Sequence, residues 1–350
     1  MTVLAFARHL ILCGALALVS AVVVVAMMSA GVIDRPAARK AHTRPTPKGG
    51  GMGIVVAFLL GIAVLYSTAS FARIADPYFL GVILGAALIA VVSYLDDVRD
   101  WPFTIKLAAQ VVAALAVIGS GLWVRVFNVP GVGGVDVGWF GVVATLGWIV
   151  FATNAMNFID GLNGLCAGVA LIACGFLAGI AQSAGGLFVY AAAMLLAAGL
   201  VGFLPFNFPR ARIFLGDVGS QFCGFVLAVL GVAAARFEQV ELSFLLVPML
   251  LSGVLFDVGF TLIRRVASGQ GVTTPHRGHL YQVAHRTGMD ARAIAAVHWG
   301  FAVAGGLVAV GFVAVPSGVK PLLPALVVLP QLLWLAWVYR RARRARLGPW

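Results

Sequence analysis

The stretch YFLGVILGAALIAVVSYLDDVRD, residues 78–100, decides the fold. Its first part carries no charged side chain, and a run of roughly 18 apolar residues is long enough to cross the hydrocarbon layer as a helix. The run ends in Asp96 and Asp97, so its first ionisable groups fall where the helix leaves the membrane. Gly81 and Gly85 lie one helical turn apart and allow a neighbouring helix to pack closely.

Similar apolar segments recur along the whole chain, in which 62% of the residues are hydrophobic and 10% are charged. No connection between them has room for a separate soluble domain, so we predict one membrane-embedded domain over residues 1–350. Its fold class is all-α, a polytopic helical bundle with about eleven transmembrane helices, or ten if one segment does not span. The first segment is longer than the roughly 15 apolar residues of a signal peptide, and we expect it to remain as a helix. The predicted spans are 10–30, 51–70, 78–95, 104–123, 139–156, 164–182, 186–205, 219–235, 243–263, 293–314 and 321–339.

The basic residues predict how the chain crosses the membrane. Most of the 24 lysines and arginines fall on connections that share one side, which indicates an outer amino terminus and a cytoplasmic carboxyl terminus. These residues suit contact with anionic lipid, whereas nucleic-acid binding is a poor explanation because they are scattered over several connections. The basic stretches are 35–48, 99–106, 210–212, 264–292 and 340–346.

The same topology sorts the carboxylates. Both glutamates of the chain are on the outer side, so acid, base or metal chemistry on the inner side must use aspartate and histidine. The carboxylates left outside are Asp76, Asp136, Glu238 and Glu241.

The cysteines predict no metal site or redox motif. All four lie in or at the ends of apolar segments, without CxxC spacing or nearby histidines, so we expect small buried hydrophobic side chains. They are Cys13, Cys166, Cys174 and Cys223.

The first polar cluster is LDDVRD, at the inner end of the third span. On a continuing helix Asp96 and Asp100 share a face, while Asp97 points about 100° away. Adjacent carboxylates repel one another unless a cation offsets them. Lys106 follows shortly afterwards, which suits a site that holds phosphate charges. The alternative is a solvated helix end that pairs with Arg99.

The second cluster, NAMNFIDGLNGL, begins at residue 154 and places four oxygen-bearing side chains at three-residue spacing. On a helix they form one polar stripe, and the two glycines let backbone approach a ligand. Amide and carboxylate oxygens are ligands of the type that Mg²⁺ prefers. The alternative is hydrogen bonding between helices. The four residues are Asn154, Asn157, Asp160 and Asn163.

The third cluster, FLGDVGS, places Asp217 between Gly216 and Gly219 at the start of the eighth span. We predict that Asp217 joins the same inner site, because the other acidic motifs converge on that membrane face. The alternative is a helix N-cap, with Arg210 and Arg212 serving only as topology signals.

The fourth cluster lies in the long inner connection 264–292, which contains HRGHLYQ. A connection of this length is either functional or disordered. His276, Arg277 and His279 fall within four positions, and this favours a substrate-binding loop. Arg277 is able to bind a diphosphate through two parallel hydrogen bonds.

The remaining polar residues of the spans have simpler interpretations. Asp257 lies inside the ninth span, where an unpaired carboxylate is costly, and we treat it as structural because no partner is evident. Four histidines are isolated in the sequence and have no predicted role. They are His9, His42, His285 and His298.

The clusters together predict one kind of chemistry. Acidic and amide oxygens, a lysine, and a loop of histidines and arginine would face the cytoplasm at the lipid boundary. This set suits a divalent metal that bridges a diphosphate, because phosphoryl transfer depends on positioning and charge neutralisation.

Five motifs occur in the order found in one family: PTPKGG at 45–50, LDDVRD at 95–100, NAMNFIDGLNGL at 154–165, FLGDVGS at 214–220 and HRGHLYQ at 276–282. The chain resembles the polyprenyl-phosphate N-acetylhexosamine-1-phosphate transferases over nearly its whole length. The resemblance implies transfer of sugar-1-phosphate from a UDP-N-acetylated sugar to undecaprenyl phosphate, with release of UMP and a requirement for Mg²⁺ that Mn²⁺ can meet. It also implies a bacterial cytoplasmic (inner) membrane enzyme that starts cell-surface glycan assembly, and it is compatible with a homodimer.

The resemblance also implies residue roles. Asp96 and Asp97 would orient or deprotonate the acceptor phosphate, and Asp160 would support the metal site or the nucleotide. The metal ligands would be Asn157 and Asp217. The substrate contacts would be Lys48, Lys106, Asn154, Asn163, His276, Arg277 and His279. Direct and two-step transfer both fit these residues.

Two positions depart from the family pattern. Position 163 is asparagine where bacterial members usually have aspartate, so a contact there loses a charge. HRGHLYQ differs from the histidine-rich motif of the muramoyl-pentapeptide branch and is similar to the O-antigen-initiating branch, whose donors include 6-deoxy N-acetylated sugars. The donor stays open between these and N-acetylglucosamine.

Other classes explain the sequence less well. An intramembrane prenyltransferase would need a second aspartate-rich repeat, and a CDP-alcohol phosphotransferase would need a DGxxAR run. A transporter or lipid flippase would place its polar groups near the bilayer midplane, whereas here they cluster at one surface.

Overall fold

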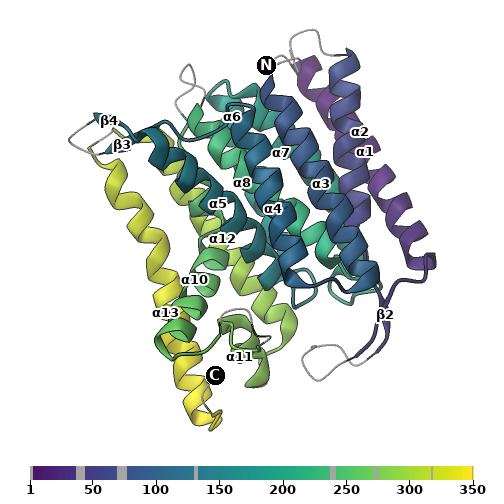
Figure 1. Ribbon diagram of the computed structural model, residues 1–350, viewed down its shortest axis with the longest axis vertical. Helices are drawn as coiled ribbons and strands as arrows, with labels where there is room; N and C mark the ends of the chain where they lie inside the picture. The colour runs from purple at the N-terminus through teal and green to yellow at the C-terminus, as the bar shows by residue number, and fades with distance from the viewer. Residues whose placement is uncertain are drawn as a thin grey trace.

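The structure is a computed structural model that describes residues 3–36, 44–68, 77–129, 133–236, 242–271, 274, 276–316, 318–348 and 350. It is built almost entirely from helices (Figure 1). The helices are α1 (Val3–Ser29), α2 (Gly51–Thr68), α3 (Pro77–Arg99), α4 (Phe103–Gly119), α5 (Gly138–Ile159), α6 (Leu165–Ser183), α7 (Leu187–Asn207), α8 (Gly216–Arg236), α9 (Leu246–Leu250), α10 (Ser252–Ala267), α11 (Leu280–Arg286), α12 (Ala291–Ala314) and α13 (Leu323–Arg344), with a 3-10 turn at Lys320–Leu322. Two short antiparallel pairs join β1 (Ile33–Asp34) to β2 (Thr46–Pro47) and β3 (Val126–Val129) to β4 (Gly133–Asp136).

The prediction of an all-α polytopic membrane protein is confirmed. In the described parts of the chain nine helices are long and apolar enough to cross a membrane, and α4 is a shorter apolar helix. Each predicted span except the ninth corresponds to one helix. The predicted ninth span, 243–263, is divided at Leu251 into α9 and α10. At Leu251 the backbone has φ −96° and ψ 11°, outside the helical range, and Pro248 lies in the first turn of α9, where the missing N–H costs no helical bond.

Helix α8 lies at the centre of the bundle. In the most apolar 18 residues of its span, 94% of the residues are buried, against 22% in the corresponding stretches of α1 and α13. It packs against α2, α3, α5, α6, α7 and α9. A helix that is apolar on all sides is stable only inside such a bundle or in lipid.

Glycines permit the closest helix contacts, as predicted for Gly81 and Gly85. A Cβ atom on Gly81 would lie 2.6 Å from the Ala116 carbonyl oxygen, so α3 and α4 touch backbone to backbone. A Cβ atom on Gly51 would lie 2.2 Å from the Gly219 Cα, which brings the start of α2 against the start of α8. Small residues thereby permit close packing between these helices.

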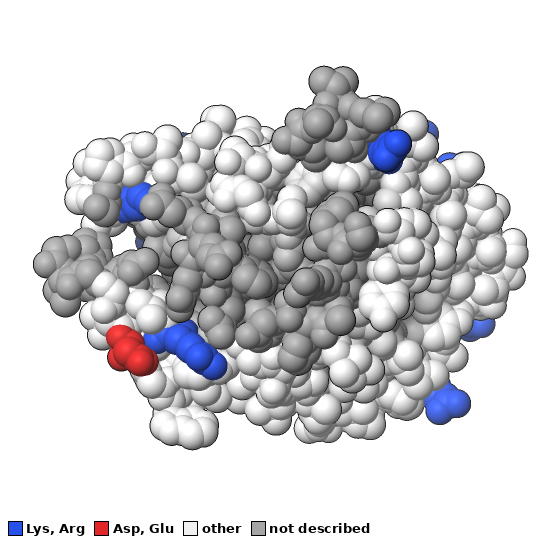
Figure 2. All heavy atoms as spheres, turned by 90° about the horizontal axis from the view of Figure 1, so that it is seen from above, with Lys and Arg blue, Asp and Glu red and all other residues white. Residues whose placement is uncertain are grey.

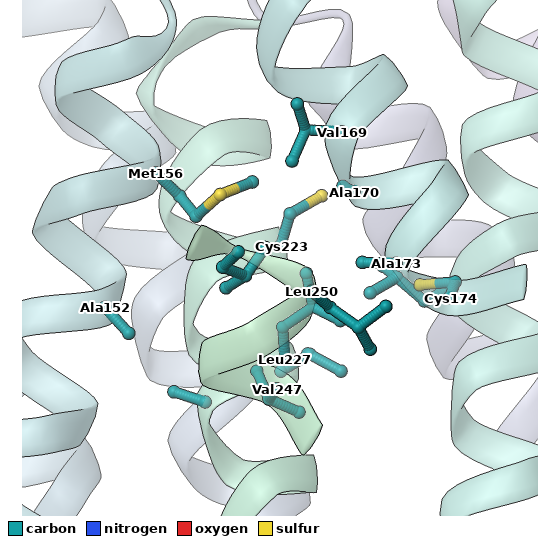
Figure 3. Close-up of a cluster of buried hydrophobic side chains, with 14 of the residues drawn as sticks. Ala152, Met156, Val169, Ala170, Ala173, Cys174, Cys223, Leu227, Val247 and Leu250 are labelled. Carbon is teal, nitrogen blue, oxygen red and sulfur yellow. The ribbon is translucent and has the colours of Figure 1, made fainter. Parts of the chain in front are cut away.

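The cysteines behave as predicted. Cys166, Cys174 and Cys223 are fully buried and Cys13 is partly buried, and all four are free thiols. Figure 3 shows Cys174 and Cys223 among Met156, Leu227 and other apolar side chains of the core.

The two ends of the bundle differ in polarity. The amino terminus and the β3–β4 pair lie at one end, and the β1–β2 pair, α11 and the carboxyl terminus lie at the other (Figure 1). Figure 2 shows the first end, where the described residues present few charged side chains, one acidic residue lying beside a basic one. The assignment of the other end to the cytoplasm stays a prediction. Several residues used for the topology lie outside the described residues, namely Arg39, Lys40, Arg73, Asp76, Glu238 and Glu241, as does the isolated His42.

Candidate active site

One cavity collects the predicted motifs at the end of the bundle that carries β1, β2 and α11. Its volume is about 350 Å³. Among the predicted site residues it is lined by Lys48, Asp96, Asp97, Lys106, Asn157, Asp160, Asn163, Asp217 and Arg277. It is also lined by Asp34, Asp100, Asn207, Gly216, Tyr281, Gln282 and His285, together with apolar and glycine positions. Asn154, His276 and His279 are absent from this lining.

Lys106 joins two of the motifs. Its Nζ donates to Asp96 Oδ2 at 2.8 Å and to Asp217 Oδ2 at 2.9 Å. The Asp96 side chain is 7% exposed and that of Lys106 is 19% exposed, so these charges are largely removed from water. The ammonium group offsets two carboxylates that would otherwise repel each other.

Asp97 caps the first turn of α8. Its Oδ1 accepts from the Asp217 N–H and its Oδ2 from the Val218 N–H, each at 3.1 Å. A carboxylate is favourable here because the first N–H groups of a helix are unpaired and carry partial positive charge. Gly216 has φ +75° and a Cβ there would lie 2.6 Å from Asp97 Oδ2, so this position requires glycine.

The N-cap interpretation of Asp217 is therefore wrong, because Asp97 supplies the cap. The Asp217 side chain instead accepts from Asn157 Nδ2 at 3.1 Å, from Gln221 Nε2 at 3.2 Å and from Lys106. Asn157 Nδ2 also donates to Ser220 Oγ at 3.0 Å. Asp217, in the third cluster, is thus joined to the first cluster through Lys106 and to the second through Asn157.

Lys48, which directly follows the strand β2, enters the site. The Phe214 N–H donates to the Pro47 carbonyl, and the Gly50 N–H donates back to the Phe214 carbonyl, so the motif around Lys48 lies along the segment that precedes α8. Lys48 Nζ lies 3.8 Å from Asp97 Oδ1 and 3.6 Å from Asp100 Oδ1. It is a second cation beside the paired carboxylates.

The polar residues in and after α5 have two different roles. Asn154 bonds to Gln110 on α4, at 2.5 Å from its Nδ2 to Gln110 Oε1, as the interhelical alternative expects. Asn157, Asp160 and Asn163 line the cavity. The pKa of Asp160, which follows the end of α5, is raised well above its ordinary value by burial and then by the Asp217 and Asp97 carboxylates.

Asp257 binds residues of the 276–282 motif. These are the partners of Asp257 that the sequence did not reveal. Its Oδ1 accepts from the Leu280 N–H at 2.9 Å, and its Oδ2 accepts from the Tyr281 N–H at 3.0 Å. His279 Nδ1 lies 3.2 Å from Asp257 Oδ1, and His279 is only 4% exposed. This geometry assigns His279 a place behind the cavity wall, where it fixes the start of α11.

His276 does not line the cavity either. Its Nδ1 accepts from the Gly278 N–H at 3.2 Å. Burial lowers the pKa of His276 to about 4, with further lowering by His279, Arg265 and Arg264, so its ring is neutral at pH 7.

Tyr281 fastens α11 to the end of α5. Its hydroxyl donates to the Phe158 carbonyl at 3.0 Å and accepts from Gln282 Nε2 at 3.1 Å. A Cβ on Gly161 would lie 2.2 Å from the Tyr281 hydroxyl, which explains glycine after Asp160.

His285 was interpreted as isolated, and the structure corrects this. It lines the cavity one helical turn beyond Tyr281. The signal in the sequence was its spacing, since residues 281, 282 and 285 share one face of a helix.

These features define a class: a multi-pass membrane protein with a polar cavity at an end of the bundle, in which carboxylates, amides and cations surround a space for a charged ligand. Residues 79–235 match the family model described as glycosyl transferase family 4. The chain is 31% identical to the "Probable undecaprenyl-phosphate N-acetylglucosaminyl 1-phosphate transferase" of Bacillus subtilis (strain 168), over 72% of this chain and 69% of the relative. It is 33% identical to the "Decaprenyl-phosphate N-acetylglucosaminephosphotransferase" of Mycobacterium tuberculosis (strain ATCC 25618 / H37Rv), over 72% and 68%.

A third relative is the "Undecaprenyl-phosphate alpha-N-acetylglucosaminyl 1-phosphate transferase" of Thermotoga maritima, at 29% identity over 73% of each chain. The chain belongs to glycosyl transferase family 4, the polyprenyl-phosphate N-acetylhexosamine-1-phosphate transferases. The family resemblance drawn from the motifs is confirmed.

Proposed function

We propose that the protein transfers N-acetylglucosamine 1-phosphate from the UDP-sugar to undecaprenyl phosphate, and that this reaction starts a cell-surface glycan. An oxygen of the acceptor phosphate would attack the sugar-linked phosphorus of the donor, and the bond from this phosphorus to the bridging oxygen would break, so that UMP leaves. The observation that carries the proposal is the convergence of all five motifs on one cavity of about 350 Å³. The printed names of the relatives favour N-acetylglucosamine as the donor sugar.

The residues around Asp217 fit a magnesium ion. Asp96 Oδ1 is buried and has no hydrogen-bond partner in the described part of the chain, so it is an acceptor without a donor. Asp96, Asn157 and Asp217 would hold the ion. Among the described residues no group of three or more His, Cys, Asp or Glu side chains forms a closed metal site. Mg²⁺ typically binds one or two carboxylates and completes its shell with substrate phosphate oxygens and water. When bound, it would neutralise the diphosphate charge.

The other residues of the cavity would bind and orient the two substrates. Lys48, Lys106 and Arg277 place three cations on its wall, where an acceptor phosphate and a donor diphosphate need charge compensation. Asp97 would act by fixing the first turn of α8, and with it Asp217. Asp160, with its raised pKa, is able to hold a proton near the reacting phosphates.

The membrane placement belongs to the same proposal. The cavity would open to the cytoplasm at the inner face of a bacterial inner membrane, where UDP-sugars are made. The lipid acceptor would arrive from the bilayer.

Release of UMP tests the proposed function. Purified protein would receive undecaprenyl phosphate, Mg²⁺ and a panel of UDP-sugars that includes N-acetylglucosamine and 6-deoxy N-acetylated sugars. We expect acceptor-dependent UMP release with UDP-N-acetylglucosamine, and its loss in Asp217→Ala and in Asp97→Ala. Absence of UMP release with every N-acetylated donor would refute the function, and undiminished release by both variants would refute the site.

A further inference from the structure

Helix α11 brings a histidine into the cavity that the five motifs do not include. His285 lines the cavity together with Tyr281 and Gln282. The helix is held in place because Asp257 binds the Leu280 and Tyr281 N–H groups. The hydroxyl of Tyr281 bonds to the carbonyl of Phe158. The helix that carries His285 is therefore attached to both Asp257 and Phe158.

The ring of His285 has a defined orientation. Its Nδ1 lies 3.1 Å from the carbonyl oxygen of Met289. A carbonyl oxygen only accepts hydrogen bonds, so Nδ1 carries the hydrogen and donates it. In the neutral ring Nε2 is then an acceptor. No other hydrogen bond of this ring occurs in the described part of the chain, which leaves Nε2 for a ligand.

The chemistry of the substrates selects which of them His285 meets. A neutral imidazole nitrogen that accepts needs an O–H or N–H group opposite it. The phosphate of polyprenyl phosphate is mostly doubly ionised at pH 7, because the second pKa of a phosphate monoester is about 6, so it offers few donors. A UDP-sugar carries hydroxyls, an amide N–H and a uracil N–H. In the neutral form of the ring, Nε2 therefore discriminates in favour of the sugar nucleotide.

We propose that His285 is a specificity-determining residue for the sugar-nucleotide donor, and that its Nε2 accepts a hydrogen bond from a hydroxyl or N–H group of that donor. This inference rests on the proposed function. It adds a contact on α11, one helical turn beyond the HRGHLYQ motif, to the cations and carboxylates already described.

Two substitutions separate the contact from the structural role of the ring. In His285→Asn the amide nitrogen takes the place of Nδ1 and keeps the bond to Met289, but nothing replaces Nε2. In His285→Gln the amide lies near the place of Nε2. We expect His285→Asn to raise the KM for the UDP-sugar about tenfold, the factor for one hydrogen bond, with the KM for undecaprenyl phosphate unchanged. His285→Gln should recover part of this loss.

The matched control is His9→Asn, since His9 bonds to Tyr190 and does not line the cavity. It should leave both KM values unchanged. Inhibition by UDP then identifies which part of the donor His285 contacts. If the inhibition constant of UDP rises in His285→Asn by the same factor as the donor KM, the contact is with the nucleotide. If this constant is unchanged, the contact is with the sugar.

The inference is overturned if His285→Asn keeps the wild-type donor KM. It is also overturned if both substitutions at position 285 raise the two KM values together, since that is the behaviour of a structural residue. Failure of the proposed function looks different, because wild-type protein itself would then release no UMP.

Discussion

Replacement of Lys106 by methionine tests the electrostatic core of the site. The Lys106 Nζ lies 2.8 Å from Asp96 Oδ2 and 2.9 Å from Asp217 Oδ2, so Lys106→Met leaves two carboxylates without their cation. Removal of one partner from a buried ion pair costs about 3–5 kcal/mol. Because the Lys106 and Asp217 side chains are 19% and 26% exposed, water screens part of this, and we expect a loss of about 3 kcal/mol in the free energy of unfolding. Reversible unfolding in mixed detergent micelles measures it.

The double variant Lys106→Met/Asp96→Asn provides the internal control. Asparagine removes one of the two uncompensated charges, so we expect the double variant to recover about half of the lost stability. Both variants should lose UMP release, because the cation is absent from each. A Lys106→Met protein with wild-type stability, or a double variant less stable than the single one, would show that the ammonium does not balance these carboxylates.

Three further predictions concern other parts of the site. Gly161→Ala should displace the Tyr281 hydroxyl, lower stability by about 1–3 kcal/mol and reduce UMP release. Gly175→Ala in α6, where a Cβ has no neighbour within 4 Å, should be neutral or slightly stabilising, and equal behaviour of the two would contradict the packing argument. The pKa of His276 is lowered in the folded state to about 4, so its protonation opposes folding. Stability should be full above the unfolded pKa of about 6.5 and fall as the pH drops toward 4, and His276→Gln should flatten this part of the profile, as unfolding at several pH values would reveal. Finally, chelation with EDTA should abolish UMP release and added Mg²⁺ should restore it, whereas persistent activity in EDTA would exclude the metal.

Much of the fold was predictable because hydropathy is a local property of the chain. Apolar runs of sufficient length have few stable alternatives to a membrane helix, so the spans were located within a few residues. The division at Leu251 does not follow from the sequence, because the apolar run continues through it and only the backbone conformation shows that the helix is interrupted.

The membership of the candidate site was predictable in part. Charged and amide residues at span ends had to lie at a membrane surface, which brought nine of the predicted residues to one cavity. Asn154 and His279 show the limit of this reasoning. Each has the right chemistry and lies two or three positions from a lining residue in the sequence, yet Asn154 bonds to Gln110 and His279 to Asp257.

By itself the sequence determined the class of protein, the helical spans and the chemical groups gathered at one end of them, since these follow from composition and from periodicity along a single chain. Only the tertiary structure decided which group meets which: Lys106 between Asp96 and Asp217, Asp97 at the first turn of α8, and His285 in the cavity. The reason is that a buried polar atom must be paired, and its available partners depend on how helices distant in the sequence pack together.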